Sequence, residues 1–417
     1  MQYDLLTLPN GLTLLGLPMP HLHTVSVGLM VNCGSVYEEA EISGISHFIE
    51  HMLFDGTEKR TCRDLACEMD KIGGLLNAFT DREDTCFHTT AVSGHLPVVF
   101  DLISDMVLAS RFDPADIRKE KKVILEEIAM IGDAPDELVY DLLPVAQMGL
   151  QKVSRPVIGS AKTVKALSRE TLLAYKETMY SPRRAVLALA GKYDWSEVVS
   201  LADRYFGAWE GGEGPEKAVY ASPASPTVIL RPKDIEQTHI CMGWNGEASG
   251  SPGYYPLTIL NTIVGGAISS RMNQIIREKH ALAYNVYSSI GNTLTGGQFS
   301  VYAGTNPVKA NRVLSLMKKE ITGIVKHGVT EAEFEQAKEQ TLSGIVMSLD
   351  SSMSRMLAVG QRLLLHGDIL SDEDLLERVK TVTLASVNDL ARRMFSEKPF
   401  AAIVGAGTEN IDLSLIG

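Results

Sequence analysis

The chain has 417 residues, 45% of them hydrophobic, and a formal net charge of −12 at neutral pH. This length exceeds what one hydrophobic core usually serves, so at least two domains are expected, and the acidic balance disfavours binding to nucleic acid or acidic membranes. No apolar run reaches membrane-spanning length, and neither a basic signal region nor an Arg-rich presequence follows Met1, so the expected location is the cytoplasm.

The first clear element is a strand at residues 23–32, "HTVSVGLMVN", whose alternation predicts one buried face. It is followed at residues 42–57 by "ISGISHFIEHMLFDGT", an apolar segment that predicts a helix ending at glycine. This helix carries His47, Glu50 and His51 among its apolar residues. Positions 47 and 51 are one turn apart on the same face, and position 50 is adjacent to both.

These three polar residues need a physical explanation. An ionised Glu50 among apolar neighbours is costly unless it is paired. Two imidazoles presented together suit a divalent ion, most often zinc, and His-x-x-Glu-His is the inverted form of the metalloprotease motif His-Glu-x-x-His. We therefore predict a metal site at His47 and His51, the alternative being two hydrogen-bonded core histidines beside a surface glutamate.

A catalytic zinc ion usually has three protein ligands, so a third must come from elsewhere in the chain. Residues 119–130, "KEKKVILEEIAM", predict a helix on which Glu120 and Glu127 are two turns apart and face the same way. One carboxylate of this pair can bind the metal while the other orients a liganding histidine. Glu126 is an alternative to Glu127 as the ligand, and a solvated charged face is the alternative for Glu120.

The chain divides near its middle. Residues 211–227 are rich in Gly, Pro, Ser and Ala and have no periodicity, which is typical of a linker. The predicted domains are residues 1–210 and 228–417. The two halves also repeat each other in sequence pattern. The segments that align are 111–128 with 328–345, and 47–57 with 257–267.

The second copy lacks the polar residues of the first. Aligned to His47, Glu50, His51 and Glu127 stand Leu257, Leu260, Asn261 and Gly344. A duplicated helix that keeps its apolar positions but loses its acids and imidazoles did not need them for folding. We therefore expect the chemistry in the first half only.

Strand patterns precede the repeated helices in both halves, at residues 23–32 and 238–245. Strands and long helices interleave without the strict alternation of a parallel βαβ sheet. The predicted fold class is therefore α+β, with two homologous domains that each contain a mostly antiparallel sheet packed against helices.

These residues resemble a known family. "HFIEHMLFDGT", followed 76 positions after His51 by the glutamate of "VILEEI", is similar to the pitrilysin and mitochondrial processing peptidase family of inverted-zincin metallopeptidases. The resemblance covers nearly the whole chain, and the length fits the half-size bacterial members. It implies that His47, His51 and Glu127 bind one zinc ion per chain. It also implies that Glu50 is the general base and Glu120 a helper acid.

A second stretch also resembles the family. Residues 73–85, "GGLLNAFTDREDT", are similar to its substrate-binding strand, which implies peptide contacts at Asn77, Ala78, Phe79 and Thr80. Physically this would be an edge strand that an extended peptide lengthens through main-chain hydrogen bonds. An ordinary hairpin edge is the alternative interpretation.

A third matching stretch lies in the second half, at residues 276–289, "IREKHALAYNVYSS". It resembles the family's Arg and Tyr pair, here Arg277 and Tyr284, and the resemblance implies that they hold the substrate and stabilise the oxyanion. Without the family they would be a charge at a helix end and a core aromatic residue. His280 and Ala281 depart from the pattern, because relatives commonly carry Arg and Gly there.

The function that the resemblance implies is a zinc metalloendopeptidase that cleaves unfolded peptides, such as leader or signal-type peptides or other short peptides. The family's active chamber is a clamshell of four homologous domains, and this chain supplies two. A homodimer is therefore the simplest expectation, and a heterodimer is possible. The alternative function is a non-catalytic peptide-binding or structural subunit of a heterodimeric processing complex.

Overall fold

The computed structural model describes residues 3–215 and 227–417, which divide into two compact units. Residues 216–226, most of the predicted linker, lie outside the described residues. The described part of the first unit comprises residues 3–128, 156–215 and 346–372, and that of the second comprises 129–155, 227–345 and 373–417. Each unit thus includes a segment from the other half of the sequence.

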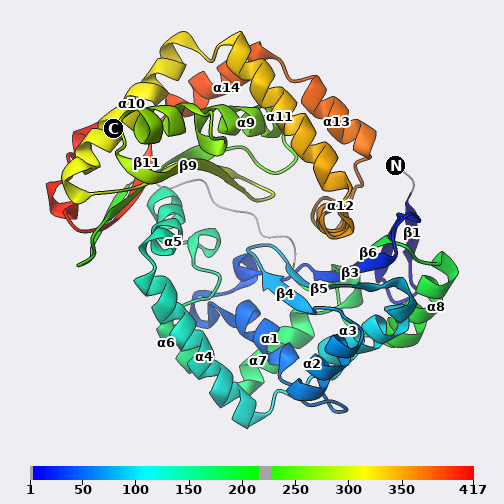
Figure 1. Cartoon of the computed structure of the whole chain (residues 1–417). Coiled ribbons are helices and arrows are strands. Elements are labelled where there is room, and N and C mark those ends of the chain that lie inside the picture. The colour runs from blue at the N-terminus through cyan, green and yellow to red at the C-terminus, as the bar shows by residue number, and fades with distance from the viewer. Residues whose placement is uncertain (1–2, 216–226) are drawn as a thin grey trace. The chain divides into compact units, whose positions relative to one another are not determined.

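The first unit is built on a six-stranded sheet with the order β1-β2-β6-β3-β5-β4 (Figure 1). Only β2 and β6 pair in parallel, and the other neighbours are antiparallel. The short strand β4 is one edge of this sheet. The strands are β1 (Asp4–Thr7), β2 (Thr13–Pro18), β3 (Thr24–Val31), β4 (Asn77–Thr80), β5 (Thr85–Val92) and β6 (Ala185–Gly191).

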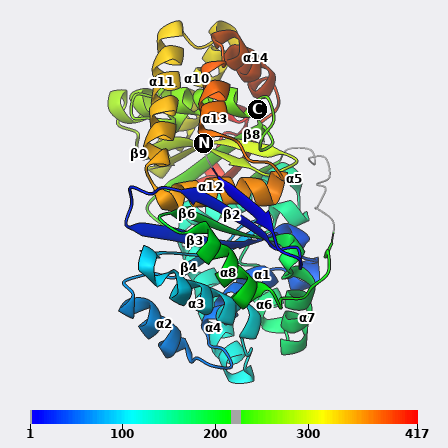
Figure 2. The ribbon, with the colours of Figure 1, turned by 90° about the vertical axis from the view of Figure 1, so that its right-hand side faces the viewer.

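Helices cover both faces of this sheet. The larger core lies between the sheet and the helices that include α1 and α3, and the smaller one lies against α12 (Figures 1 and 2). The helices of this unit are α1 (Ile45–Phe54), α2 (Cys62–Lys71), α3 (Leu96–Ala109), α4 (Pro114–Asp133), α6 (Ala161–Ala166), α7 (Arg169–Met179), α8 (Trp195–Phe206) and α12 (Ser352–His366). The last turn of α4 belongs to the second unit.

Alternation along the strands supplies both cores. Leu29 on β3 is buried in the larger core, and the next residue, Met30, is buried against α12. Two glycines allow α12 to approach the sheet closely. A Cβ atom on Gly28 would lie 2.5 Å from the Met356 sulfur, and one on Gly360 would lie 2.7 Å from the Met30 sulfur. Helix α12 therefore packs on the first unit's sheet although it comes from the second half of the chain.

The second unit contains a five-stranded sheet with the order β7-β11-β8-β10-β9, in which only β7 and β11 are parallel. Helix α5, from the first half of the chain, packs on one face, where Val139 and Leu143 contact the cluster around Tyr302 and Phe400. The strands are β7 (Val228–Pro232), β8 (Thr238–Gly246), β9 (Ala283–Asn292), β10 (Gly297–Thr305) and β11 (Phe400–Gly405). The helices are α5 (Pro135–Met148), α9 (Tyr254–Asn261), α10 (Ala310–His327), α11 (Glu331–Leu349), α13 (Asp372–Lys380) and α14 (Leu384–Phe395). The last turn of α11 and the first residue of α13 belong to the first unit.

The predicted fold class is confirmed. Both units contain a mixed, mostly antiparallel sheet packed against helices, and the aligned segments form matching elements, α1 with α9 and α4 with α11. The predicted strands at residues 23–32 and 238–245 are β3 and β8. Within residues 3–215 and 227–417, none of the helices combines the length and apolarity needed to cross a bilayer.

Candidate metal centre

Helix α1 carries the predicted motif, and its first turn is anchored by a buried acid. Gly44 precedes the helix with a φ of 94°, which favours glycine, and a Cβ there would lie 2.5 Å from the Ile158 carbonyl oxygen. The backbone N–H groups of Gly44 and Ser46 donate to the carboxylate of Glu38, at 2.7 and 2.9 Å. Glu38 is fully buried. It supplies acceptors for the N–H groups that a helix start leaves unpaired, and its charge is favourable there.

The apolar and polar residues of α1 separate onto two faces. Its buried apolar residues, which all belong to the larger core, are Ile45, Phe48, Ile49, Met52 and Leu53. His47, Glu50 and His51 are half-buried on the other side. The core therefore fixes the helix, while the polar trio remains accessible to a ligand.

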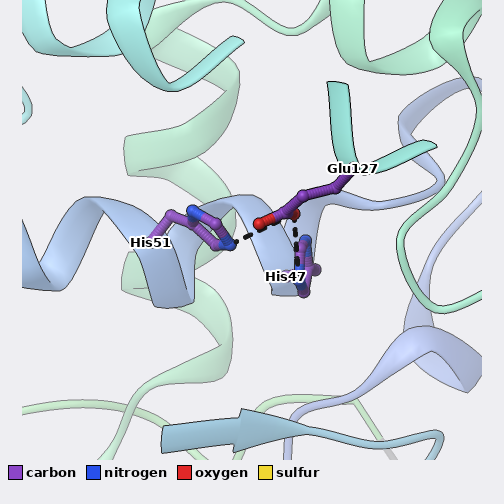
Figure 3. Close-up of side chains that lie close together, drawn as sticks. All are labelled: His47, His51 and Glu127. Atoms are coloured by element: carbon purple, nitrogen blue, oxygen red, sulfur yellow. Dashed lines mark ion pairs between the residues drawn. The ribbon is translucent and has the colours of Figure 1, made fainter. Parts of the chain in front are cut away.

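Three of the predicted residues converge on one point. His47 and His51 project from α1, and Glu127 reaches toward both from α4 (Figure 3). The Glu127 Oε2 atom lies 3.6 Å from His51 Nε2 and 4.0 Å from His47 Nε2. These three residues are a group that could hold a metal ion, with one donor atom from each lying within 4.8 Å of the others.

The donor separations fit a zinc ion. Tetrahedral zinc with bonds of about 2.0–2.2 Å places its donors about 3.3–3.6 Å apart. The Glu127–His51 separation of 3.6 Å is at the upper end of this range and the Glu127–His47 separation of 4.0 Å is slightly longer, so small side-chain rotations bring the atoms to the distance that zinc requires. The donor set of two imidazoles and one carboxylate is also one that zinc takes in peptidases. The residues therefore fit the metal that the sequence predicts.

His47 has the electrostatic character of a metal ligand. Burial, and secondarily the neighbouring His51, lower the pKa of His47 to about 4. Its imidazole is therefore neutral at neutral pH, the form that binds metals. Its Nδ1 atom is buried and has no hydrogen-bond partner within the part of the chain that the structure describes.

His51 is oriented by a second glutamate. Its Nδ1 atom lies 3.1 Å from Glu120 Oε2, and Lys119 Nζ contacts both Glu120 at 2.9 Å and Asp55 at 2.8 Å. Burial acts to raise the pKa of Glu120, but hydrogen bonds from Lys119 and His51 outweigh it and hold that pKa below its ordinary value. An ionised Glu120 is suited to accept a hydrogen bond from the Nδ1–H group of His51, an arrangement in which the Nε2 atom faces Glu127.

Glu50 lies next to the donor cluster but points to the edge strand. The Thr80 hydroxyl, at the end of β4, donates to Glu50 Oε2 at 2.5 Å. Burial raises the pKa of Glu50 above its ordinary value, with this hydrogen bond acting in the opposite direction. A carboxylate with a raised pKa beside a metal site is suited to accept and return a proton.

The predicted substrate-binding residues lie on an edge strand. Asn77, Ala78, Phe79 and Thr80 form β4 itself, and the Asn77 side chain accepts from the Ala78 N–H at 2.9 Å. Their contacts with a peptide stay a prediction.

Arg277 and Tyr284 lie in the second unit and contact each other, with the guanidinium carbon 5.3 Å from the centre of the phenol ring. Tyr284 is 78% exposed, so it is not the core aromatic residue of the alternative interpretation. Ala281, in the loop between them, has a φ of 49°. The departure from glycine at this position therefore places an alanine in the left-handed region.

Sequence reasoning missed three contributors to the site: the Glu38 cap on α1, the bridge from Lys119 to Asp55, and the contact of Thr80 with Glu50. A carboxylate a few residues upstream of a helix start is a recognisable signal for the first. The other two join positions 64 and 30 residues apart, and the sequence pattern contains no sign of either contact.

Comparisons with known proteins agree with this geometry. A family model described as "Insulinase (Peptidase family M16)" matches residues 19–161, which include all three donors, and one described as "Peptidase M16 inactive domain" matches residues 166–341. A protein of Mycobacterium bovis named "uncharacterized zinc protease" is 37% identical over 403 residues, 96% of this chain and 92% of the relative. A Bacillus subtilis protein with the same description is 33% identical over 398 residues, covering 95% and 97%.

Solved structures share the fold. The crystal structure of a peptidase M16 inactive domain from Pseudomonas fluorescens superposes with a TM-score of 0.89 at 19% identity, covering 97% of this chain and 98% of that one. A protease from Helicobacter pylori gives a TM-score of 0.89 at 18% identity, with coverage of 97% and 99%. The fold and the paired histidines with their glutamate are those of inverted-zincin proteins. The chain belongs to peptidase family M16, the insulinase or pitrilysin family, and matches its half-length bacterial members, which are named zinc proteases.

Proposed function

We propose that this protein is a zinc-dependent endopeptidase that hydrolyses unfolded peptides, including leader or signal-type peptides. The observation that carries the proposal is the convergence of His47, His51 and Glu127, with Glu50 one residue from a donor on the same helix. The relatives named zinc proteases support the same activity.

His47, His51 and Glu127 would hold the metal through the atoms that face one another. Zinc, when bound, would supply polarisation of the scissile carbonyl and would acidify a water molecule. Glu120 fixes the ring of His51 by accepting a hydrogen bond from its Nδ1–H group, so the Nε2 donor atom needs no reorientation.

Glu50 moves the proton in the proposed reaction. Its carboxylate accepts a proton from the attacking water and then delivers it to the amine that leaves. Burial favours the protonated form of Glu50, which makes this carboxylate a stronger base than an exposed one and eases acceptance of the proton from water.

We propose that the peptide substrate binds as an added strand of the first sheet. β4 is an edge of the first sheet and lies beside α1, so an extended peptide paired with it passes close to Glu50 (Figure 1). Such pairing uses main-chain hydrogen bonds and therefore selects unfolded peptides over folded proteins. Arg277 and Tyr284 are proposed to hold the substrate and the oxyanion.

The proposed assembly is a dimer, with a homodimer as the simplest form. The chain has the length of half-size family members, and it carries both the metal-binding residues and the Arg277–Tyr284 pair. Light scattering coupled to gel filtration tests this assembly. A monomer that still cleaves peptides would contradict it.

Glu50→Gln tests catalysis against simple peptide binding. The variant keeps the shape of the side chain but removes its basicity, so it should retain zinc and lose turnover of a peptide that the wild type cleaves. Glu126→Gln is the matched control, since Glu126 precedes the metal-binding Glu127 on α4 and the site does not use it. Cleavage is read by mass spectrometry on a diverse peptide library, with and without a chelator. Cuts that persist in Glu50→Gln, or in chelator, would refute the proposal.

A further inference from the structure

The last residue of the edge strand faces the proposed general base. Side chains alternate along β4: the Phe79 ring lies 5.9 Å from the His88 ring and packs in the smaller core, whereas Ala78 packs against the larger core on the α1 side. Thr80 points to the same side as Ala78 and reaches Glu50. The strand that is proposed to bind peptide thus carries a side chain that contacts the proposed base.

Within residues 3–215 and 227–417, the Glu50 carboxylate accepts one hydrogen bond, and its donor is the Thr80 hydroxyl. Thr80 has a single hydroxyl proton, and the 2.5 Å distance between its Oγ1 atom and Glu50 Oε2 shows that this proton is donated to Glu50. Thr85 lies 3.3 Å from the Thr80 hydroxyl, but its own proton has a nearer acceptor in the Cys33 carbonyl oxygen at 2.7 Å. Without Thr80, the Glu50 carboxylate would be free to rotate away from the position it holds.

We propose that Thr80 is a positioning residue for the reaction, because its hydroxyl fixes the Glu50 carboxylate and links the peptide-binding strand to the base. This inference rests on the proposed function, in which Glu50 transfers the proton. The proposed role requires a hydroxyl group at position 80. Serine provides one, whereas valine has nearly the same shape as threonine but no hydroxyl.

A purely structural role is the rival explanation, and the second unit shows why it must be tested. There the Ser288 hydroxyl, on edge strand β9, donates to the Asn261 side-chain oxygen at 2.7 Å, and the Asn261 carbonyl oxygen lies 3.0 Å away as a second possible acceptor. That bond also joins a helix to an edge strand. However, Leu260 stands at the position aligned to Glu50, so the second unit keeps a bridge without presenting a base.

The experiment compares Thr80→Val, Thr80→Ala and Thr80→Ser in the full-length, zinc-loaded protein. Measured quantities are kcat and KM on one cleaved peptide, zinc content by mass spectrometry, and melting temperature. Thr90→Val is the matched control: it also removes a hydroxyl from the first sheet, one that contacts Ser26 at 2.7 Å. Thr80→Ala stands in for Thr80→Val if the branched side chain prevents folding.

Thr80→Val and Thr80→Ala should lower kcat by about 10- to 100-fold, the effect expected when a catalytic group is misplaced, with KM and zinc content near wild type. Thr80→Ser should restore most of kcat. The inference is overturned if valine and alanine leave kcat unchanged, if Thr90→Val lowers it equally, or if serine fails to restore it. A wild-type protein that binds zinc but cleaves nothing would instead overturn the proposed function, and this inference with it.

Discussion

Arg60→Met should destabilise the first unit strongly, because Arg60, in the segment that follows helix α1, contacts three acids. Its guanidinium donates to Glu68 on α2 at 3.0 and 3.1 Å and to Asp105 on α3 at 2.8 Å, and it also contacts Asp101. Thr57, in the segment that follows α1, donates to the same Asp105 carboxylate at 2.7 Å. Arg60 therefore holds the loop after α1 against two neighbouring helices.

The magnitude follows from the burial of each acid. The Asp105 side chain is 2% exposed, so removing Arg60 leaves a buried charge without its cation, a change that typically costs about 3–5 kcal/mol. Asp101 and Glu68 are 29% and 33% exposed, so water replaces part of their contact and they add little. The Thr57 hydroxyl still donates a hydrogen bond to Asp105 when Arg60 is removed. The expected loss of unfolding free energy is therefore at the lower end of this range, about 3 kcal/mol.

Urea unfolding followed by tryptophan fluorescence and circular dichroism measures this loss. Two of the three tryptophans, Trp195 and Trp209, lie in the first unit and Trp244 lies in the second, so the larger part of the fluorescence signal comes from the first unit. Arg183→Met is the control, since Arg183 and its partner Glu213 are 56% and 84% exposed and their pair should be worth less than about 1 kcal/mol. The double variant Arg60→Met/Asp105→Asn should be more stable, by about 1–3 kcal/mol, than the sum of the losses of the two single variants would give. An Arg60→Met loss no larger than that of Arg183→Met would refute the reasoning.

Three further predictions concern separate parts of the chain. Glu120→Gln should weaken zinc binding by about 10- to 100-fold in a chelator competition, because it removes the charge that orients His51; unchanged affinity would contradict that role. Ala281→Gly should raise the free energy of unfolding by about 0.5–1 kcal/mol. At a φ of 49° glycine relieves about 1–2 kcal/mol of backbone strain, which exceeds its larger loss of conformational entropy on folding. A variant less stable than the wild type would contradict this prediction. Burial acts to raise the pKa of Glu333, but hydrogen bonds, first that from Arg271, lower it to about 2 from 4.5. The stability advantage of wild type over Glu333→Gln should therefore be complete above pH 4.5 and shrink as pH falls toward 2, and an advantage independent of pH would contradict this assignment.

The sequence predicted local structure well because helix and strand periods reflect local geometry. The spacing of His47 and His51 places both rings on one face of a helix, whatever the rest of the chain does. The pattern of residues 119–130 also predicts a helix, but its periodicity alone does not decide whether Glu126 or Glu127 is the third metal ligand. The structure brings Glu127 to the histidines because α4 packs with that face toward α1.

The features that the sequence did not predict depend on distant contacts. Helices α5 and α12 each pack on the sheet of the unit formed mainly by the other half of the chain. The glycines that admit α12, Gly28 and Gly360, are more than 300 residues apart, and neither is a turn residue. The Thr80 contact with Glu50 likewise requires the strand and the helix to be placed side by side.

The central claim is that two imidazoles and one carboxylate of the first unit form a zinc site, and isothermal titration of metal-free protein with zinc tests it most directly. The account predicts one site per chain in the wild type and in Glu126→Gln, and loss of that site in Glu127→Gln. A wild type that takes up no zinc, or a Glu127→Gln variant that binds zinc as tightly as the wild type, would contradict it.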